Sequence, residues 1–584
     1  MTFDRLLRRL RTGRHLRLSQ VAWRLRYLLE RKLPVRSTSR SRPAHHPEML
    51  RPDFPSIPVV KLQESGNRVV EKLALGSLQL LNREEHFGSE CLDWRLGPRA
   101  SQRLWTITLH YHTWLYPLAE VAASGSGEAQ KAFRLFKRFV SDWLDHCDLE
   151  RPGARDFAWN AYAIATRICW WIRSYRLIPR SLWDHAPEFE RAFLDSLWKQ
   201  AAYLKGHLEY DLLGNHLLRD AVGLAWAGRF FDASEARQWL GTATQIALSQ
   251  AEEQVLPDGG HIERSPMYHL HVMEDFLSLG QLLKDGPARS AMRRAWERMA
   301  ECSVWLSHPD GNIPLLNDAA LNGSCTLEEM ASQGLLVGWP ADVSAQRGGK
   351  LFPHLGLFIW HGDPWTIFFD VGPIGVDYQP GHGHADTLAI EASFRGQRLW
   401  VDPGTWAYDL DDRRQYDRST EAHNTVCVDQ WDSSEVWHIF RCGRRAYPTD
   451  VRVTTGEGGF SVSAGHDGYR HLSGGPHPRR DVTLHPDQRL VITDRCDGRG
   501  THRLSGGWLL APGWSAIPCD GGWRVHRSES GALMIRILGP PGLKLHQSPR
   551  WYHPEFGLEV VTTRLEWTVE TDLPAEITTV QQPE

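Results

Sequence analysis

The stretch LGLFIWHGDPWTIFFDV, residues 355–371, decides the fold class of the second half of the chain. Two short apolar runs flank the turn sequence His361-Gly362-Asp363-Pro364, a pattern typical of short strands in an all-β domain. Further strand-like runs with turns between them follow towards the C-terminus, at 387–394, 398–401, 480–484, 489–494 and 558–569. We therefore expect an antiparallel β-sandwich domain over residues 349–584.

The sequence before this β-rich half predicts helices. Apolar residues recur there at helical spacing, over 104–121, 129–147, 157–174, 189–208, 216–231, 233–254 and 266–283. Successive helices with short connections form antiparallel hairpins. Because 584 residues are too many for one core, we expect an α+β multidomain protein with a helical domain over 56–348.

Residues 1–55 predict a basic N-terminal arm followed by a linker. Residues 1–44 contain 13 Lys/Arg and 2 Asp/Glu. Apolar residues recur at helical spacing over 18–29, with arginines between them. One interpretation is an amphipathic helix that makes peripheral contact with an anionic membrane surface. The other, which we favour, is a helix docked on its own protein with its arginines in water.

Bulk composition excludes several classes of protein. The whole chain has 67 Lys/Arg and 70 Asp/Glu, which leaves 54 Lys/Arg and 68 Asp/Glu after residue 44. This part of the chain is therefore acidic and is not a basic nucleic-acid binder. The 9 cysteines form no C-x-x-C pair, which argues against a disulfide framework or a cysteine zinc site. Neither a secretory signal nor an apolar run of roughly 18 residues is visible. These absences favour a cytoplasmic location and leave the compartment open.

Two segments of the helical half combine polar groups that suit catalysis. GNHLLRD covers residues 214–220, at the start of a predicted helix. DGGHIERSPMYH covers residues 258–269, where Ser265 suits a helix cap and Pro266 the first helical position. Tyr268 is then expected to project from the first turn of that helix.

A third segment lies in the β-rich half. GHGHAD, residues 381–386, is followed by Asp402 and His423. Imidazole and carboxylate groups of this kind hold zinc ions, and the set leaves one histidine for chemistry.

Four motifs resemble those of the heparinase II/III family of polysaccharide lyases, which includes related alginate lyases. They are Asn215-His216-Leu217-Leu218, Glu263-Arg264-Ser265-Pro266-Met267-Tyr268-His269, Gly383-His384-Ala385-Asp386 and His423-Asn424-Thr425. The resemblance implies an N-terminal α/α toroid, a C-terminal antiparallel β-sandwich and β-elimination of uronic-acid glycans. Chains that resemble this one, with a basic arm, also occur as accessory proteins of bacterial polysaccharide synthesis.

The chemistry of elimination explains these residue types. A uronate C5 proton is weakly acidic while its carboxylate is charged, so hydrogen bonds must neutralise that carboxylate. The resemblance implies this role for Asn215, with His216 assisting or acting as base. It implies that Tyr268 protonates the leaving oxygen, and in a syn elimination also removes the proton. It implies that His382 binds the carboxylate or acts as base. The plainer interpretation of Asn215 is a helix N-cap.

The resemblance also implies a structural zinc ion, held by His384, Asp402 and His423 beside His382. Three protein ligands leave a position for water or a fourth ligand. In a hairpin turning at 394–397, Asp402 lies opposite about Ala389, five residues from His384. Contact between the ligands therefore requires the strand to bend or the glycine loop to fold back.

Three further residues are candidates for binding the glycan. Arg167 resembles a family position on a helix facing the cleft, and the alternative is an ion pair within its helix. Tyr408 and Tyr416 are cleft candidates that no motif fixes. Glu263 and Arg264 are expected to pair with each other structurally.

Two other functions compete with a lyase of anionic polysaccharides. A glycoside hydrolase typically needs two carboxyl groups beside the bond, for which Asp220, Asp258 and Glu263 are available. A catalytically silent glycan-binding protein of exopolysaccharide assembly is the other alternative. The glycan stays open among heparan sulfate, alginate and a bacterial exopolysaccharide.

Overall fold

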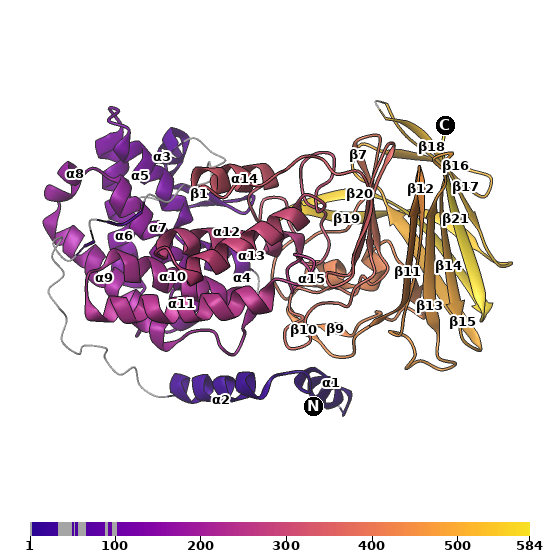
Figure 1. Ribbon diagram of the computed structural model, residues 1–584, viewed down its shortest axis with the longest axis horizontal. Coiled ribbons are helices and arrows are strands. Elements are labelled where there is room, and N and C mark those ends of the chain that lie inside the picture. The colour runs from indigo at the N-terminus through magenta and orange to yellow at the C-terminus, as the bar shows by residue number, and fades with distance from the viewer. Residues whose placement is uncertain are drawn as a thin grey trace.

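Helices fill one half of the molecule and antiparallel sheets fill the other (Figure 1). This computed structural model describes residues 3–32, 50–51, 53–55, 66–87, 92–95, 102–528 and 530–584. The last helix of the helical half ends at Leu336, and the strands of the β half begin at Gly348. The switch therefore lies next to the predicted position. The predicted linker before residue 55 lies mostly outside the described residues.

The helical half is built from helices that pack on their neighbours in sequence. α10 contacts α7, α9, α11 and α12, and almost all of its residues are buried. The helices are α3 (Gly66–Ala74), α4 (Arg103–Leu109), α5 (Tyr116–Ala123), α6 (Ala129–His146), α7 (Ala161–Leu177), α8 (Arg180–Asp184), α9 (Pro187–Gly206), α10 (Gly214–Phe230), α11 (Ser234–Gln254), α12 (Pro266–Leu282), α13 (Pro287–Ser303) and α14 (Leu327–Leu336). A short hairpin, β1 (Ser77–Leu80) and β2 (Arg83–His86), lies among them.

One predicted helix is two. The structure divides 104–121 into α4 and α5, because His112 between them adopts a φ of 59°. That left-handed conformation ends a helix. The His112 ring is held by a hydrogen bond of 2.9 Å from Trp171 Nε1 to its Nδ1, so a tertiary contact overrides the local helical pattern.

The β half contains three main antiparallel sheets. Their strand orders are β3-β4-β5-β6-β7, β11-β12-β13-β14-β21-β18-β17-β16 and β19-β20-β15-β8. The strands are β3 (Gly348–Phe352), β4 (Leu357–His361), β5 (Trp365–Asp370), β6 (Ile390–Phe394), β7 (Gln397–Trp400), β8 (Cys427–Val428), β9 (Val436–Trp437), β10 (Arg441–Cys442), β11 (Pro448–Gly456), β12 (Gly459–His466), β13 (His477–Leu484), β14 (Leu490–Asp497), β15 (Thr501–Leu509), β16 (Ser515–Cys519), β17 (Gly522–Arg527), β18 (Gly531–Leu538), β19 (Lys544–Glu555), β20 (Leu558–Asp572) and β21 (Ala575–Pro583). A short helix, α15 (Asp412–Arg418), lies in the same half.

The sequence LGLFIWHGDPWTIFFDV forms the hairpin β4–β5, as its pattern predicts. The next strand is shorter than the predicted run 387–394, because β6 begins only at Ile390. Leu388 adopts a φ of 67°, far from the dihedral angles of a regular strand. The residues before Ile390 therefore form a loop that folds back onto β5, where Leu388 N donates to Asp370 O at 3.1 Å.

The basic arm forms two helices, α1 (Phe3–Gly13) and α2 (Leu18–Lys32), which lie along the outside of both halves (Figure 1). Gln20 of α2 is fully buried against the rest of the protein, whereas Leu18 and Leu25 are exposed. The arm is therefore docked on its own protein, but with its apolar face turned outwards.

Candidate active site

A cavity of ≈ 1450 Å³ is bounded by both halves of the molecule and by the arm. The four predicted catalytic residues, Asn215, His216, Tyr268 and His382, all line it, together with Tyr408. These residues come from α10, from α12 and from two loops of the β half. The fold thus brings together side chains that are far apart in the sequence.

Tyr268 sits in the first turn of α12, as predicted from its cap. Ser265 is the N-cap and accepts a hydrogen bond from Tyr268 N at 3.2 Å, and Pro266 follows it. The Tyr268 hydroxyl lies 2.9 Å from the Tyr408 hydroxyl. Burial raises the pKa of Tyr268 well above its ordinary value, so the phenol is protonated and can act as a proton donor.

His382 reaches the cavity from the loop before β6. Its ring stacks on the Tyr268 ring, with centroids 3.8 Å apart and an interplanar angle of 13°. Gly383 follows because a Cβ there would lie 2.2 Å from Ile374 O. His382 Nδ1 donates to Glu263 Oε2 at 2.6 Å, and this contact joins the β half to the helical half.

Glu263 is a buried carboxylate that hydrogen-bonds two of the cavity residues, Asn215 and His382. Burial opposes its ionisation, but His382 and further hydrogen bonds outweigh burial and lower its pKa to about 2. Its Oε1 accepts a hydrogen bond of 3.0 Å from Asn215 N. The predicted pairing of Glu263 with Arg264 is wrong, because Arg264 Nη2 donates instead to His354 O at 2.8 Å.

Asn215 does not cap its helix, contrary to the plainer interpretation. The N-cap of α10 is Leu213. The Asn215 Oδ1 atom is buried and has no hydrogen-bond partner among the described residues. A buried polar atom without a partner calls for a ligand or a water to satisfy it. This amide is therefore positioned to bind a group that enters the cavity.

His216 is held beside Asn215 by a carboxylate. Its Nδ1 donates to Glu209 Oε2 at 3.1 Å. Burial lowers the pKa of His216, but the charge and hydrogen bond of Glu209 outweigh it and raise the pKa above the ordinary 6.5. The cavity therefore contains an imidazole that holds its proton more strongly than an ordinary histidine does.

Two predicted glycan-binding residues lie elsewhere. Arg167 is fully buried, and its Nε, Nη1 and Nη2 donate to Gln200, His110 and Ala158 at 2.7 to 2.8 Å. The Tyr416 hydroxyl donates to Trp551 O at 2.9 Å, away from the cavity lining. Both assignments are corrected, because a residue must reach the cavity surface to touch a glycan. Of the three candidates, Tyr408 alone lines the cavity.

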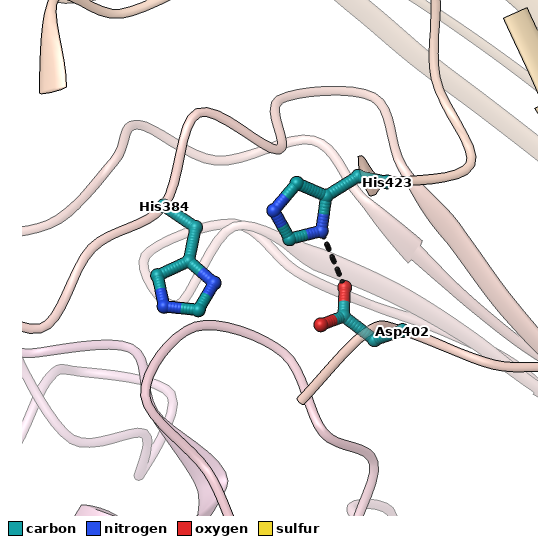
Figure 2. A group of neighbouring side chains, drawn as sticks. All are labelled: His384, Asp402 and His423. Atoms are coloured by element: carbon teal, nitrogen blue, oxygen red, sulfur yellow. Dashed lines mark hydrogen bonds and ion pairs between the residues drawn. The ribbon is translucent and has the colours of Figure 1, made fainter. Parts of the chain in front are cut away.

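His384, Asp402 and His423 form a buried cluster in the β half (Figure 2). One ligand atom from each lies within 4.8 Å of the others. His423 Nδ1 donates to Asp402 Oδ2 at 2.7 Å. The loop before β6 folds back to bring His384 to the other two residues, which is one of the two ways that the spacing required.

Two buried ring nitrogens of the cluster lack a hydrogen-bond partner within the described part of the chain, which makes the cluster suitable for a zinc ion. His384 Nδ1 and His423 Nε2 are buried without a hydrogen-bond partner among the described residues. His384 Nε2 donates to Asp318 Oδ1 at 2.9 Å. A carboxylate on the second ring nitrogen is the usual arrangement of a histidine that binds metal through its first. The donor set of two imidazoles and a carboxylate therefore fits zinc.

Comparison with known proteins places the chain in a family. Residues 46–342 match the family described as "Heparinase II/III N-terminus", and residues 344–580 match "Heparinase II/III-like, C-terminal". This chain belongs to the heparinase II/III family. The resemblance read from the four motifs is confirmed.

The chain is similar to several named proteins. A "Heparin-sulfate lyase" of Bacteroides stercoris is 24% identical over 506 residues, covering 79% of this chain and 72% of the relative. "FtsZ-localized protein C" of Caulobacter vibrioides is 24% identical over 388 residues, covering 65% of this chain and 62% of the relative. The crystal structure of heparinase III matches with a TM-score of 0.76 at 18% identity, covering 92% of this chain and 87% of that one. The heparinase III fold is therefore shared.

Several contributors to this heparinase II/III cavity were not predicted. Arg24 and Tyr27 of the arm line it. The Arg24 side chain donates to Asp211 O at 3.2 Å, and the Tyr27 hydroxyl donates to Leu208 O. The sequence carries no motif for either residue, and the arm's charge was the only signal.

The carboxylates proposed for a hydrolase do not line the cavity. Asp220 Oδ2 accepts a hydrogen bond of 2.7 Å from Glu209 N, and Asp258 Oδ2 accepts from two backbone amides at 2.7 and 2.8 Å. Both carboxylate oxygens of Glu263 accept hydrogen bonds, one from Asn215 N and one from His382 Nδ1. No pair among these three is therefore placed for hydrolysis.

Proposed function

We propose that the cavity is the active site of a polysaccharide lyase that cleaves a uronic-acid-containing glycan by β-elimination. The observation that carries this proposal is the meeting of Asn215, His216, Tyr268 and His382 around one cavity. The names of the lyase relatives and the shared heparinase III fold support the same activity. We further propose that the helical half is the α/α toroid domain, over 56–348, and that the β half is the β-sandwich domain.

The carboxylate of the bound uronate would meet the amide of Asn215. Its place in the cavity wall supports this role. A hydrogen bond from the amide Nδ2 stabilises negative charge as it develops on the carboxylate during proton removal. Glu209 raises the pKa of His216, and the protonated form of this imidazole would add positive charge next to the carboxylate. Together the two residues make the C5 proton more acidic.

The proton transfers fall to Tyr268 and His382. His382 donates Nδ1–H to the ionised Glu263, which leaves Nε2 as the ring nitrogen for the substrate. His382 takes the C5 proton through Nε2, because the raised pKa of Tyr268 keeps its phenol protonated. The C4–O bond breaks, and a C4–C5 double bond forms. The Tyr268 hydroxyl gives its proton to the leaving oxygen. A proton that passes from His382 to Tyr268, directly or through solvent, restores both groups. No water is consumed, and the atoms of the two fragments equal those of the substrate.

Zinc held by His384, Asp402 and His423 would have a structural role in this account. A bound zinc ion would supply a cross-link between three loops of the β half. The histidines would bind it through Nδ1 of His384 and a ring nitrogen of His423. The neighbouring His382 is thereby held at the cavity wall.

The substrate is proposed to be an anionic polysaccharide. Arginines from several elements face the cavity, which suits a carboxylated or sulfated chain; they include Arg24, Arg103, Arg441 and Arg445. The names of the lyase relatives favour heparan sulfate, and alginate and a bacterial exopolysaccharide are the other candidates.

The test is ultraviolet absorbance of unsaturated uronate across a panel of these glycans. Wild type is expected to raise the absorbance on at least one glycan, and Tyr268→Phe is expected not to. Tyr416→Phe is the matched control, because it removes a tyrosine hydroxyl bound to a backbone carbonyl outside the cavity. A folded wild-type protein inactive on every glycan would count against a lyase and favour glycan binding.

A further inference from the structure

Helix α2 contacts the protein through Gln20, Trp23 and Tyr27 and turns its leucines to the outside. Gln20 is fully buried, and its Nε2 donates to the carbonyls of Asp211, Leu212 and Tyr378 at 3.3 to 3.4 Å. Trp23 stacks on Tyr210 with ring centroids 4.9 Å apart. An ordinary surface helix buries its apolar stripe instead, so the orientation of α2 calls for an explanation.

The arm is anchored to both halves of the molecule, which fixes this orientation. Arg17 forms an ion pair of 2.6 Å with Glu253 of the helical half. Arg11 Nε donates to Glu435 of the β half at 2.8 Å, and Trp437 Nε1 donates to Thr12 Oγ1 at 3.1 Å. The apolar face of the arm therefore cannot turn inwards without breaking contacts at both ends.

The outward face is a row of leucines. Leu18, Leu25 and Leu29 of α2 are 88%, 58% and 64% exposed. They lie seven and eleven residues apart, which is one side of a helix. Leu6 and Leu10 of α1 are also exposed. We call Leu18, Leu25 and Leu29 the leucine face. Large exposed apolar patches mark contact sites for proteins or membranes.

The positive charge of the arm favours a membrane over a protein as the partner of the leucine face. The arm carries 13 Lys/Arg and 2 Asp/Glu over residues 1–44, whereas the rest of the chain is acidic. Arg9 and Arg14 of the arm are exposed, whereas Arg17 and Arg26 pair with Glu253 and Glu30. A helix with leucines on one face and arginines around them matches the interface of an anionic bilayer, where apolar side chains enter the acyl boundary and cations meet headgroups.

We propose that the leucine face binds the surface of an anionic lipid bilayer, with α1 and α2 lying in the plane of the interface. None of the helices in the described part of the chain is long and apolar enough to cross a membrane, so binding is peripheral. The inner side of α2 lines the cavity through Arg24 and Tyr27. The cavity is therefore held next to the membrane, where a glycan enters alongside lipid headgroups.

The test is co-sedimentation of the full chain with vesicles, without any glycan. Vesicles of phosphatidylglycerol and phosphatidylcholine are compared with vesicles of phosphatidylcholine alone. The triple variant Leu18→Gln, Leu25→Gln and Leu29→Gln is expected to weaken binding to the anionic vesicles at least roughly tenfold. The matched control changes three exposed leucines away from the arm, Leu335→Gln, Leu336→Gln and Leu538→Gln, and is expected to bind like wild type.

A second variant tests the electrostatic part. Arg9→Gln with Arg14→Gln is expected to weaken binding to anionic vesicles and to make the remaining binding less sensitive to salt. Circular dichroism melts check that every variant folds. Equal wild-type binding to neutral vesicles, no binding to either kind, or undiminished binding by the triple variant would each overturn the proposal. Wild-type dimers that the triple variant abolishes would instead assign the leucine face to contact between two copies.

Discussion

His382 and His384 are separated by one glycine, yet their rings belong to different regions of the molecule. His382 lines the cavity, stacks on Tyr268 and is bonded to Glu263 of the helical half. His384 is fully buried in the cluster with Asp402 and His423. Burial lowers the pKa of His384 to about 3, so it stays neutral, as a metal ligand must. Neighbours from distant segments, and not residue type, distinguish the two histidines.

The two regions are also joined. Asp318, which accepts from His384, donates its own backbone N–H to His382 O at 2.9 Å. Damage to the cluster is therefore expected to reach the cavity, whereas a change at the cavity surface leaves the cluster intact. Substitutions on either side can test this asymmetry.

Tyr268→Phe is expected to give the largest effect, on the cavity side alone. General acid–base groups contribute about 10²–10⁴-fold to rate, so kcat should fall by that order while the melting temperature stays close to that of wild type. Steady-state kinetics and a thermal melt measure the two. Turnover close to that of wild type would remove Tyr268 from the mechanism.

Substituting the two histidines separately sharpens the contrast. His382→Ala is expected to lower kcat by about 10²-fold and to leave zinc content unchanged. His384→Ala is expected to abolish bound zinc and to lower the melting temperature by about 3–8 °C. Elemental analysis of freshly purified protein should find at most one zinc per chain. Metal-free wild type would refute the zinc assignment.

The lowered pKa of Glu263 predicts how the free energy of unfolding depends on pH. Its folded pKa of about 2 lies below the ordinary 4.5, so its stabilisation is fully present above pH 4.5 and is lost as pH falls towards 2. It amounts to about 3 kcal/mol. Glu263→Gln should lower the free energy of unfolding by that order at pH 7 and flatten its fall between pH 5 and pH 3.

Urea unfolding at several pH values measures this dependence. Glu457→Gln, at an exposed turn, is the control and should behave like wild type. A Glu263→Gln variant with the same pH dependence as wild type would show that the His382 contact contributes little to stability.

Arg24→Ala should give the smallest effect. Arg24 lines the cavity from the arm, and one partly solvated hydrogen bond to an anionic chain changes affinity by about three- to tenfold. We expect KM to rise by that factor with kcat unchanged, because the contact is made equally in the ground and transition states. The exposed Arg536→Ala on β18 is the control. An unchanged KM would exclude Arg24 from substrate binding.

Local patterns predicted most of the fold. Strand-like runs and helical spacing placed the change from helix to strand near residue 348, and capping placed Tyr268 in the first turn of α12. The failures had tertiary causes. Trp171 holds His112 in a conformation that splits a predicted helix. The positive φ of Leu388 makes strand β6 begin later than predicted, at Ile390.

The site was predicted by its motifs but not by its contacts. Glu263 and His382 are 119 residues apart, and no local pattern relates residues so distant. Arg167 and Tyr416 failed because their burial and partners arise only from packing. The sequence also showed that α2 has an apolar face without revealing that this face points outwards.

The most direct test of the elimination chemistry is the mass balance of cleavage, measured by mass spectrometry on a defined uronate oligosaccharide that the protein cleaves. Elimination at this cavity predicts that the masses of the two fragments sum to the mass of the substrate, with the unsaturated fragment absent in Tyr268→Phe. Fragments whose summed mass exceeds the substrate by one water would establish hydrolysis and contradict the account.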